Sequence, residues 1–518
     1  MKRRKFLHQV AASLASAPLI SRAGIIASEQ ASPRGQDPIR VNSARQLFID
    51  NALISEARGV RLVLNRPYPT GERCVVADKP WESLGVWGYN SVIEDNGGLK
   101  LWYDAIASDG SRWCCLATSQ DGLHWEKPNL GIVPFKGSSD TNIVFPPVAM
   151  SHEPNCVFKD TNPACRPAEQ YKMVANLQPP GGKKGTYVAA SPDGTHWKLM
   201  KDEPAFRASD TNNICFFDNR IGRYVGYVRV WDVMRKVGRC EFDDITDWGK
   251  EQMVFSYDAE DLQGLDSHIF SANAASLGAS AIKTKPRMDF YTSAAWKYPR
   301  AEDVYLMFPA AYYHFQEDWA RRRGTTDPRN DGTLDIQFAT SRDGKSWFRL
   351  DRHPFIRLGV AGSFASATAY MASGAICRPE EIWFYYGASD HTHGNYNLAH
   401  DRFMGTITRA RMRLDGFVSV DAEYSGGEFT TPPLLFTGNQ LSLNTDTSAG
   451  GHVRVELQDE SAKPLAGFSA DDCDPINGNF IQKVVSWRDH PGMQAWAGKP
   501  VRLRFVMRDA KLYSFKFD

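Results

Sequence analysis

Residues 117–125 read ATSQDGLHW, and two close copies follow at 189–197 (AASPDGTHW) and at 339–347 (ATSRDGKSW). A degenerate copy lies at 243–248 (DDITDW), and 413–417 keeps only RLDGF. Internal repeats of this kind are typical of solenoids and propellers. Each Ser-x-Asp-Gly segment has the residues of a tight turn between two strands, and the Trp opens the second strand. We therefore interpret the repeated Asp residues as turn formers and not as catalysts.

A unit of about four strands recurs around these copies over residues 66–425. Its first copy contains an apolar strand with an acidic turn at 91–98 (SVIEDNGG) and a partner strand at 99–103 (LKLWY). Further units start near residues 155, 213, 289 and 370. The period-2, β-rich pattern excludes a helical solenoid, and five such units predict a five-bladed β-propeller. The repeat also predicts equivalent buried positions for Trp125, Trp197, Trp248 and Trp347.

The pattern changes after residue 425, where 426–433 (GGEFTTPP) reads as a linker. Five short alternating strands follow without the repeated phrase, which is typical of an antiparallel β-sandwich. The chain is thus predicted to be all-β. Its expected domains are a signal segment (1–30), a five-bladed β-propeller (40–425) and a C-terminal β-sandwich (426–518).

The N-terminus has the features of an export signal. Residues 2–7 (KRRKFL) precede an Ala- and Ser-rich apolar stretch, 10–20, that is too short to span a membrane. Paired arginines followed by Phe-Leu resemble the twin-arginine signal, and the alternative is a basic start on an ordinary Sec signal. Either route predicts a periplasmic or secreted protein, with no membrane association beyond export.

Composition excludes several classes of function. The 518 residues carry a formal net charge of +1, so there is no basic field for nucleic acid. Nine cysteines include no Cys-x-x-Cys pair, and neither zinc nor another metal is expected. Cys156 and Cys165 flank one hairpin and either pair or remain buried thiols. Phosphate-loop, dinucleotide and Gly-x-Ser-x-Gly motifs are missing from the sequence, so we expect no cofactor.

Polar residues near the start of each innermost strand are the candidates for chemistry, because propeller ligands usually sit on the axis at that end. The candidate catalytic acids are Glu82, Glu153, Asp210 and Asp289. Glycoside cleavage needs two such carboxyls, one as proton donor and one as base or nucleophile. Glu82 ranks first because it lies in a loop between strands. The alternative is that these acids only tie down loops.

The same strand starts carry residues suited to sugar rings. The predicted substrate-binding residues are Tyr89, Asn90, Tyr291, Trp296, His391 and His393. His391 and His393 lie two apart, which places them on one face of a strand. Substrate hydrogen bonding is the favoured role, because no carboxylate or Cys at recognisable spacing completes a metal site.

Five blades, the Ser-x-Asp-Gly-x-x-Trp phrase and an appended β-sandwich resemble the five-bladed propeller glycosidases, of which glycoside hydrolase families 32 and 43 are the best known. The layout is similar to family 32 over about residues 45–518. The family signature Trp-x-Asn-Asp-Pro-Asn-Gly survives only as a fragment at 87–91 (WGYNS), without the acid. Arg-Asp-Pro and Glu-Cys motifs do not occur, so the resemblance assigns no catalytic residue. The phrase also resembles the Asp-box of sialidases, which have six blades and an axial Arg triad.

Two classes of function therefore remain open. The first is an exported glycosidase that uses paired carboxylates on an oligo- or polysaccharide. The second is a non-catalytic carbohydrate-binding or scaffold propeller, with a sialidase-like propeller as a further alternative. Two carboxyls about 5–10 Å apart across an axial pocket favour the enzyme, whereas acids all paired with Arg or Lys favour the binder. The oligomeric state is left open by the sequence.

Overall fold

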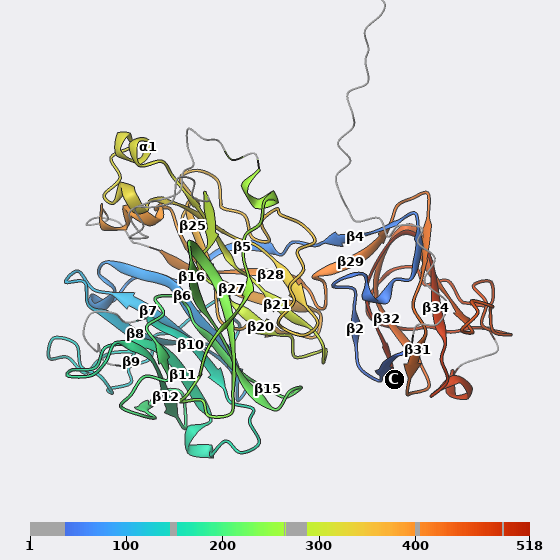
Figure 1. Cartoon of the computed structure of the whole chain (residues 1–518), viewed down its shortest axis with the longest axis horizontal. Helices are drawn as coiled ribbons and strands as arrows, with labels where there is room; N and C mark the ends of the chain where they lie inside the picture. The colour runs from blue at the N-terminus through green and yellow to red at the C-terminus, as the bar shows by residue number, and fades with distance from the viewer. Residues whose placement is uncertain (1–36, 146–152, 264, 266–286, 399–404, 489–491) are drawn as a thin grey trace, which may run out of the picture.

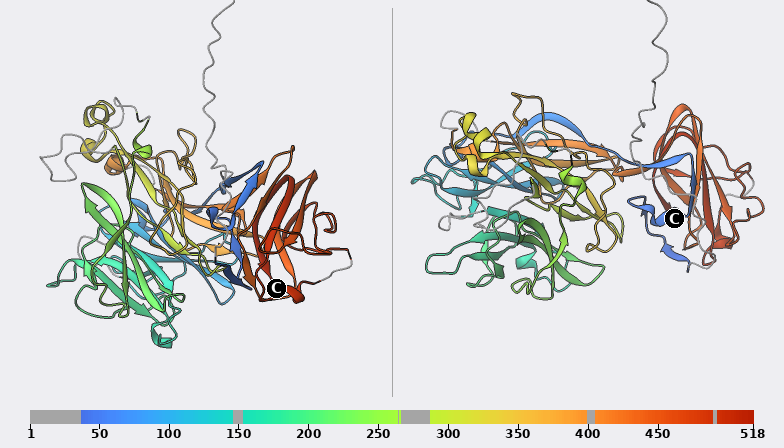
Figure 2. Two further views of the ribbon diagram at one scale, coloured as in Figure 1. Left: turned by 45° about the vertical axis from the view of Figure 1, so that its right-hand side comes forward. Right: turned by 45° about the horizontal axis from the view of Figure 1, so that its top comes forward.

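The computed structural model describes residues 37–145, 153–263, 265, 287–398, 405–488 and 492–518. These residues form two lobes that are almost entirely β-structure (Figure 1). The larger lobe is a propeller-like arrangement in which four blades are recognised, and the smaller lobe surrounds the C-terminus (Figure 2). Within the described ranges the only α-helix is α1 (Glu317–Arg322). The all-β class and the propeller-like arrangement agree with the sequence analysis, whereas the count of five blades is not confirmed.

Three blades are separate antiparallel sheets of consecutive strands. The first contains β6 (Gly85–Asp95), β7 (Gly98–Ile106), β8 (Arg112–Ser119) and β9 (Ile143–Phe145). The second contains β10 (Glu153–Lys159), β11 (Tyr171–Leu177), β12 (Gly185–Ser191), β13 (Lys198–Leu199) and β14 (Phe206–Arg207). The third contains β15 (Ile214–Asp218), β16 (Arg223–Asp232), β17 (Met234–Phe242) and β18 (Gln252–Phe255). Their sequential pairing is the meander that the repeated strand–turn–strand pattern predicts.

The rest of the larger lobe is less regular. One sheet contains β19 (Met288–Phe290), β22 (Ala310–His314), β23 (Gly332–Ile336), β25 (Thr368–Met371), β26 (Ile376–Cys377), β27 (Glu381–Ser389), β28 (Thr406–Arg413) and β5 (Tyr68–Val75). A three-stranded sheet contains β20 (Ala295–Lys297), β21 (Tyr305–Met307) and β24 (Ala339–Ser341). A single parallel pair, Leu334 with Thr368, joins β23 to β25 within this sheet. Pairing of β5 with β28 brings the start of the lobe against its end.

The repeated phrase is a turn, as the sequence analysis interpreted it. In its first copy the Gly122 amide donates to Ser119 Oγ at 2.8 Å, and Asp121 Oδ1 accepts from the Leu123 and His124 amides at 2.8 and 2.9 Å. The φ angle of Gly122 is +73°, a left-handed conformation that favours glycine. The other two complete copies repeat these contacts.

The glycine carbonyl of each complete copy also links two blades. It accepts a hydrogen bond at 2.8 Å from an aromatic side chain of another sheet, in the pairs Tyr385–Gly122, Trp102–Gly194 and Tyr227–Gly344. In these three junctions the same position of the turn is the acceptor. Its aspartates are therefore held in turns on the outer hairpins.

The repeated tryptophans occupy similar but not equally buried positions. Trp125, Trp197 and Trp248 each donate their indole N–H to the carbonyl three residues earlier. Trp248 is fully buried, whereas Trp125, Trp197 and Trp347 are half-buried at blade surfaces. The prediction of four buried tryptophans is therefore correct for one of them.

The smaller lobe is built around two long strands that pair with each other. Its sheet contains β32 (Leu441–Gln458), β33 (Asn479–Val484), β34 (Arg502–Phe517), β30 (Gly427–Thr430), β29 (Val418–Ala422), β2 (Gln46–Leu47), β3 (Glu56–Arg58) and β4 (Val60–Leu64). Beside it β1 (Ile39–Asn42) pairs with β31 (Leu434–Phe436) in parallel. Residues 39–64 and 418–422 therefore belong to this lobe by pairing, which differs from the boundary placed at residue 425. Pairing between strands distant in the sequence shows this, since β2 pairs with β34, β3 with β30 and β4 with β29.

Short 3-10 turns complete the description: η1 (Asn51–Leu53), η2 (Pro80–Glu82), η3 (Pro167–Glu169), η4 (Glu260–Leu262), η6 (Pro328–Asn330), η7 (His393–Leu398) and η8 (Gln494–Trp496). One hydrophobic core runs through both lobes, from Leu306 and Phe384 to Phe505 and Phe515. No helix in the part of the chain that the structure describes is long and apolar enough to cross a membrane.

All nine cysteines are free thiols, so the alternative of a Cys156–Cys165 disulfide is not realised. Burial raises the pKa of Cys74 to about 12 and that of Cys156 to about 11, which keeps both thiols protonated. The predicted signal segment falls within residues 1–36, outside the described residues.

Candidate functional site

The innermost strands of the larger lobe meet at a polar layer on its axis. The Val157 amide on β10 donates to Ser91 Oγ on β6 at 2.9 Å, and Ser91 pairs with Ser373 in a parallel bridge. Ser373 Oγ lies 3.4 Å from Oδ1 of Asn212, which precedes β15. These contacts link segments far apart in the sequence. We call the end of the axis where these strands start the upper end, and the end where they finish the lower end. The contacts of Ser91 and Ser373 lie between the two ends.

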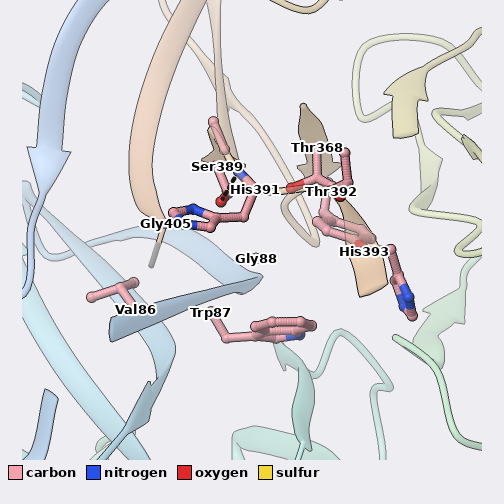
Figure 3. Close-up of a pocket in the computed structure, with 12 residues that line it drawn as sticks. Val86, Trp87, Gly88, Thr368, Ser389, His391, Thr392, His393 and Gly405 are labelled. Atoms are coloured by element: carbon pink, nitrogen blue, oxygen red, sulfur yellow. Dashed lines mark hydrogen bonds between the residues drawn. The ribbon is translucent and has the colours of Figure 1, made fainter. Parts of the chain in front are cut away.

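A pocket opens beside this upper end, between β6, β25 and the end of β27 (Figure 3). Trp87 and Tyr370 stack at 6.3 Å between ring centroids, with 30° between their planes. The polar lining residues are Thr368, Ser389, His391, Thr392 and His393. The pocket has a volume of about 30 Å³, room for a water or two.

His393 is the better fixed of the two predicted histidines. Its Nδ1 lies 3.1 Å from the Asn330 carbonyl and its Nε2 lies 3.1 Å from Tyr291 Oη. Nδ1 therefore donates, and Nε2 accepts from the tyrosine hydroxyl. Burial and the positive charge of Arg235 lower the pKa of His393 to about 3, so the ring is neutral at physiological pH. His391 is half-buried, with Nδ1 2.5 Å from the Asp390 carboxylate.

Asp289 lies close to this cluster, where an arginine and a histidine contact its carboxylate. Its Oδ2 lies 3.1 Å from Arg235 Nη1 and accepts the Arg235 amide at 3.2 Å, and its Oδ1 lies 3.4 Å from His314 Nε2. Although burial acts against the charge, Arg235 and His314 hold the pKa of Asp289 well below its usual range. The guanidinium of Arg235 also lies over the Tyr291 and Tyr312 rings. A carboxylate with a pKa held this low is ionised at neutral pH, where it pairs with Arg235.

Glu82, the acid ranked first from the sequence, is buried within the first blade. Its Oε1 accepts from Tyr103 Oη at 2.6 Å. Its Oε2 accepts from the Asp78 and Lys79 amides and pairs with Lys127 Nζ at 2.7 Å. This carboxylate caps η2 and neutralises a buried lysine. The sequence alone does not distinguish a buried, ion-paired carboxylate of this kind from a loop acid that reaches the axis.

The other predicted residues are dispersed. Asp210 is exposed in the loop before β15, and Glu153 opens β10 with its side chain outside the described set. Tyr89 and Asn90 are buried on β6, where Tyr89 packs edge-on against Tyr370. Trp296 lies at the lower end of the axis. The lining residues of the upper pocket include none of Glu82, Glu153, Asp210 and Asp289.

Sequence reasoning missed Asp104, on β7 behind the pocket. This side chain is buried and pairs with Arg112 at 3.2 Å, and the Arg112 guanidinium lies over the Trp87 ring at 5.2 Å. Burial outweighs the arginine and raises the pKa of Asp104 to about 7. Asp335 on β23 has a similar shift to about 7 for the same reason. The signal in the sequence is a lone carboxylate inside the apolar run LKLWYDAI at 99–106.

The described residues contain no group of three or more His, Cys, Asp or Glu side chains able to hold a metal ion. The upper end of the axis instead offers an aromatic surface, neutral hydrogen-bonding groups and two arginines, Arg229 and Arg235, stacked on Tyr291. Such an arrangement can hold a ligand that has both apolar faces and hydrogen-bonding groups.

No protein-family model matches the chain. An uncharacterized protein of Mycobacterium tuberculosis (strain CDC 1551 / Oshkosh) is 28% identical over 152 residues, which cover 27% of this chain and 45% of that relative. A second uncharacterized protein, from strain H37Rv, is 27% identical over the same shares of the two chains. The chain therefore spans less than half the length of the curated relatives that it matches.

Solved structures with a related fold have sequence identities of 13% or less. A thermostable family-43 glycoside hydrolase has a TM-score of 0.40 at 13% identity, over 68% of this chain and 96% of its own. An α-L-arabinofuranosidase from Podospora anserina, in complex with cellotriose, has a TM-score of 0.39 at 12% identity, over 67% and 97%. A β-1,2-mannobiose phosphorylase from Listeria innocua has a TM-score of 0.42 at 11% identity, over 67% and 96%. The structures that the chain resembles are thus carbohydrate-active enzymes, at a level of likeness that carries no argument about its own activity.

Proposed function

We propose that the protein binds a saccharide at the upper end of the propeller axis, with a sugar ring against Trp87. The observation that carries this proposal is the Trp87–Tyr370 surface beside Thr368, Ser389 and His391, an apolar face edged by hydrogen-bonding groups. Sugar rings present the complementary combination of apolar faces and hydroxyl edges. Pairing of Glu82 with Lys127 and of Asp289 with Arg235 favours binding over hydrolysis by these two acids.

Replacing Trp87 by Ala is expected to weaken saccharide binding about tenfold, because a stacking surface worth about 1.4 kcal/mol is lost. The measurement is isothermal titration of the purified protein with a panel of neutral cello-, xylo-, manno- and arabino-oligosaccharides. Trp496→Ala, a half-buried tryptophan of the smaller lobe, is the matched control and should leave the Kd unchanged. The proposal fails if no member of the panel binds, or if Trp87→Ala binds as the parent does.

A glycosidase that uses paired carboxylates is the second candidate, and Asp104 is the observation that favours it. A carboxyl with a pKa near 7 matches the requirement for a general acid at neutral pH. Asp104 also contacts Arg112, which packs on the Trp87 ring of the proposed binding surface. Asp210 remains the candidate for its carboxylate partner, since it is exposed before β15.

Asp104→Asn separates the enzymatic from the structural role. The folded-state pKa of about 7 lies above the ordinary value of 3.8, so the native protein binds more protons than the unfolded chain between these values. Stability is therefore lost as the pH rises from about 4 to 7, and the amide variant does not incur this loss. We expect the melting temperature of Asp104→Asn, relative to the parent, to increase from pH 4 to pH 7.

Turnover of aryl glycosides by the same variant tests the chemistry. A general acid would make Asp104→Asn at least about a hundredfold slower with binding retained. Asp335→Asn is the matched control, because it removes a carboxyl with a similarly raised pKa from β23. Equal rates for Asp104→Asn and the parent would eliminate Asp104 as the acid.

We further propose that the larger lobe is a five-bladed propeller. The support is a ring of contacts between successive innermost segments: Ser91 with Val157, Cys156 with Cys215, Thr211 with Tyr291, Tyr291 with Tyr370, and Ser373 with Ser91. In this proposal β19–β24 form one blade interrupted at residues 291–294, 308–309 and 337–338. The smaller lobe is proposed to be a sandwich folded at the register shifts of β32. A crystal structure would test both proposals directly.

We propose that the protein is exported by the twin-arginine route, on the support of Arg3 and Arg4 followed by Phe6 and Leu7. Changing Arg3 and Arg4 to Lys is expected to trap most of the precursor in the cytoplasm, because a planar guanidinium pair is not replaced by two ammonium groups. Cell fractionation and immunoblotting measure the distribution. Unchanged export would indicate the Sec route.

A further inference from the structure

A second hollow lies at the lower end of the axis, beyond the Ser373–Asn212 layer. Its volume is about 500 Å³, within the range of small-ligand sites. The finishing ends of the innermost segments line it, including Glu94, Lys159, Phe217, Trp296, Lys297 and Ile376. None of these residues belongs to the upper pocket.

This hollow continues into a cleft between the two lobes. The cleft has a volume of about 840 Å³, and both spaces are lined by Phe217, Asn219, Lys297 and Pro299. Its other walls come from residues 43–45 and from Lys516 of β34. Together they form one surface that runs from the propeller axis to the smaller lobe.

Positive side chains dominate the cleft. Its charged lining residues are Arg45, Arg220, Lys297, Arg300, Lys516 and Glu302. Arg45 and Arg300 share one carboxylate, Asp415, at 3.3 and 3.1 Å, and Lys516 pairs with Asp518. One buried acid thus serves two guanidinium groups, which leaves the cleft with excess positive charge.

Lys297 is the residue common to both spaces. Its Nζ donates to the main-chain carbonyls of Ala301 and Glu302 and forms no ion pair within the described ranges. Arg220 likewise contacts a carbonyl, that of Arg342, and no carboxylate lies within ion-pair distance of its side chain in the described part of the chain. Burial lowers the pKa of Lys297, although the carboxylates of Asp218, Asp303 and Glu302 act in the opposite direction. Lys297 and Arg220 thus line the cleft without an ion pair of their own among the described residues.

An aromatic side chain lies next to this charge. Trp296 is half-buried, packs edge-on against Tyr298 at 5.3 Å, and precedes Lys297 on β20. Trp296 and Lys297 both line the lower hollow, which matches a sugar that carries an acidic group, since the ring face and the anion are recognised separately.

We propose that the lower hollow and the inter-lobe cleft form a second binding site for an acidic saccharide, whose carboxylate or sulfate groups pair with Lys297 and Arg220. The claim that the ligand is a saccharide rests on the proposed function. The claim that the ligand is an anion rests on the charged residues of the cleft alone. The site is separate from the upper pocket, so one chain would hold two saccharide segments of different charge.

Isothermal titration of the intact protein at about 20 and 150 mM salt tests the proposal. The ligands are a galacturonate tetramer for carboxylates, a chondroitin sulfate tetramer for sulfates, and a neutral galactose tetramer. At least one acidic tetramer is expected to bind more tightly than the neutral one, and more weakly at the higher salt concentration because screening weakens exposed charge pairs. The tetramer that binds distinguishes the two acidic groups.

Lys297→Gln and Arg220→Gln are each expected to raise the Kd of the acidic tetramer at least fivefold, whereas Lys297→Arg retains binding. Lys184→Gln removes an exposed lysine from a loop of the second blade and should stay within twofold. Trp87→Ala should also leave acidic binding unchanged, which separates failure here from failure of the upper pocket. Melting curves confirm that each variant is folded.

Three results would overturn the proposal. The first is that neither acidic tetramer binds more tightly than the neutral one. The second is that Lys297→Gln and Arg220→Gln, both folded, bind as the parent does. The third is that a short single-stranded DNA binds as tightly as the acidic tetramers, since a site for any polyanion is not a saccharide site.

Discussion

Replacing Asp415 by Asn is expected to lower the free energy of unfolding by about 3–5 kcal/mol, the cost of leaving buried positive partners without their counter-charge. The carboxylate is fully buried between the lobes, where it pairs with Arg45 and Arg300 and accepts hydrogen bonds from Tyr298 Oη at 2.5 Å and Ser514 Oγ at 3.1 Å. These partners come from both lobes. A single amide substitution therefore weakens every polar contact that converges on this point.

Differential scanning calorimetry measures the effect, and the parent is expected to melt at higher temperature with the lobes unfolding together. Asp415→Asn should melt in one transition at lower temperature, because the buried arginines lose their counter-charge while the hydrophobic core shared by the two lobes remains. Glu423→Gln is the control, since Glu423 pairs with Arg61 at the surface and such pairs contribute about 0–1 kcal/mol. A variant that melts as the parent does would show that Asp415 is not the anchor between the lobes.

Replacing Asp289 by Asn is expected to cost a similar amount, about 3–5 kcal/mol, and to disturb the upper end of the axis as well. The carboxylate compensates Arg235, whose guanidinium is stacked on Tyr291 and Tyr312 beneath Trp231. The folded-state pKa of Asp289 lies below the ordinary value near 3.9, so its contribution is present above that pH and is lost on acidification. The deficit of the variant should therefore be constant from pH 5 to pH 8.

Chemical denaturation at pH 5, 6.5 and 8 measures this deficit, and saccharide titration shows whether the axial site is disturbed. Asp243→Asn, which removes the exposed partner of Arg223, should change stability by less than about 1 kcal/mol. If Asp289→Asn retained full stability and instead lost turnover of a glycoside, the carboxylate would be a catalyst and not a counter-charge. The two outcomes therefore discriminate between the structural role described above and the catalytic role predicted from the sequence.

The sequence was informative where a local pattern has a local cause. The Ser-x-Asp-Gly phrase predicts a turn because the hydrogen bonds that form the turn join residues at most three apart, as they do around Asp121 and Gly122. Alternating apolar residues likewise predict strands, because the side chains of residues i and i+2 lie on the same face of a strand and are buried together. The all-β class and the propeller-like lobe follow from repetition of these local units.

The candidate site depends on contacts between side chains that are far apart in the sequence, which local patterns do not reveal. Glu82 and Asp289 are acids near strand starts, as predicted, but Lys127 and Arg235 reach them from 45 and 54 residues away and neutralise them. Asp104 was overlooked because burial, and not position in a strand, raises its pKa. Trp296 was assigned to the strand start, yet its strand carries it to the lower end of the axis.

The sequence by itself thus determined the strands, the turns and their repetition, because these depend on neighbours within a few residues. Tertiary structure alone decided which strands share a sheet, as when β4 joins β29 across more than 350 residues, and which carboxylates meet a cation. Pairing of distant strands and compensation of buried charge are long-range effects. Their free energy is set by three-dimensional neighbours and by desolvation, neither of which is encoded at any single position of the chain.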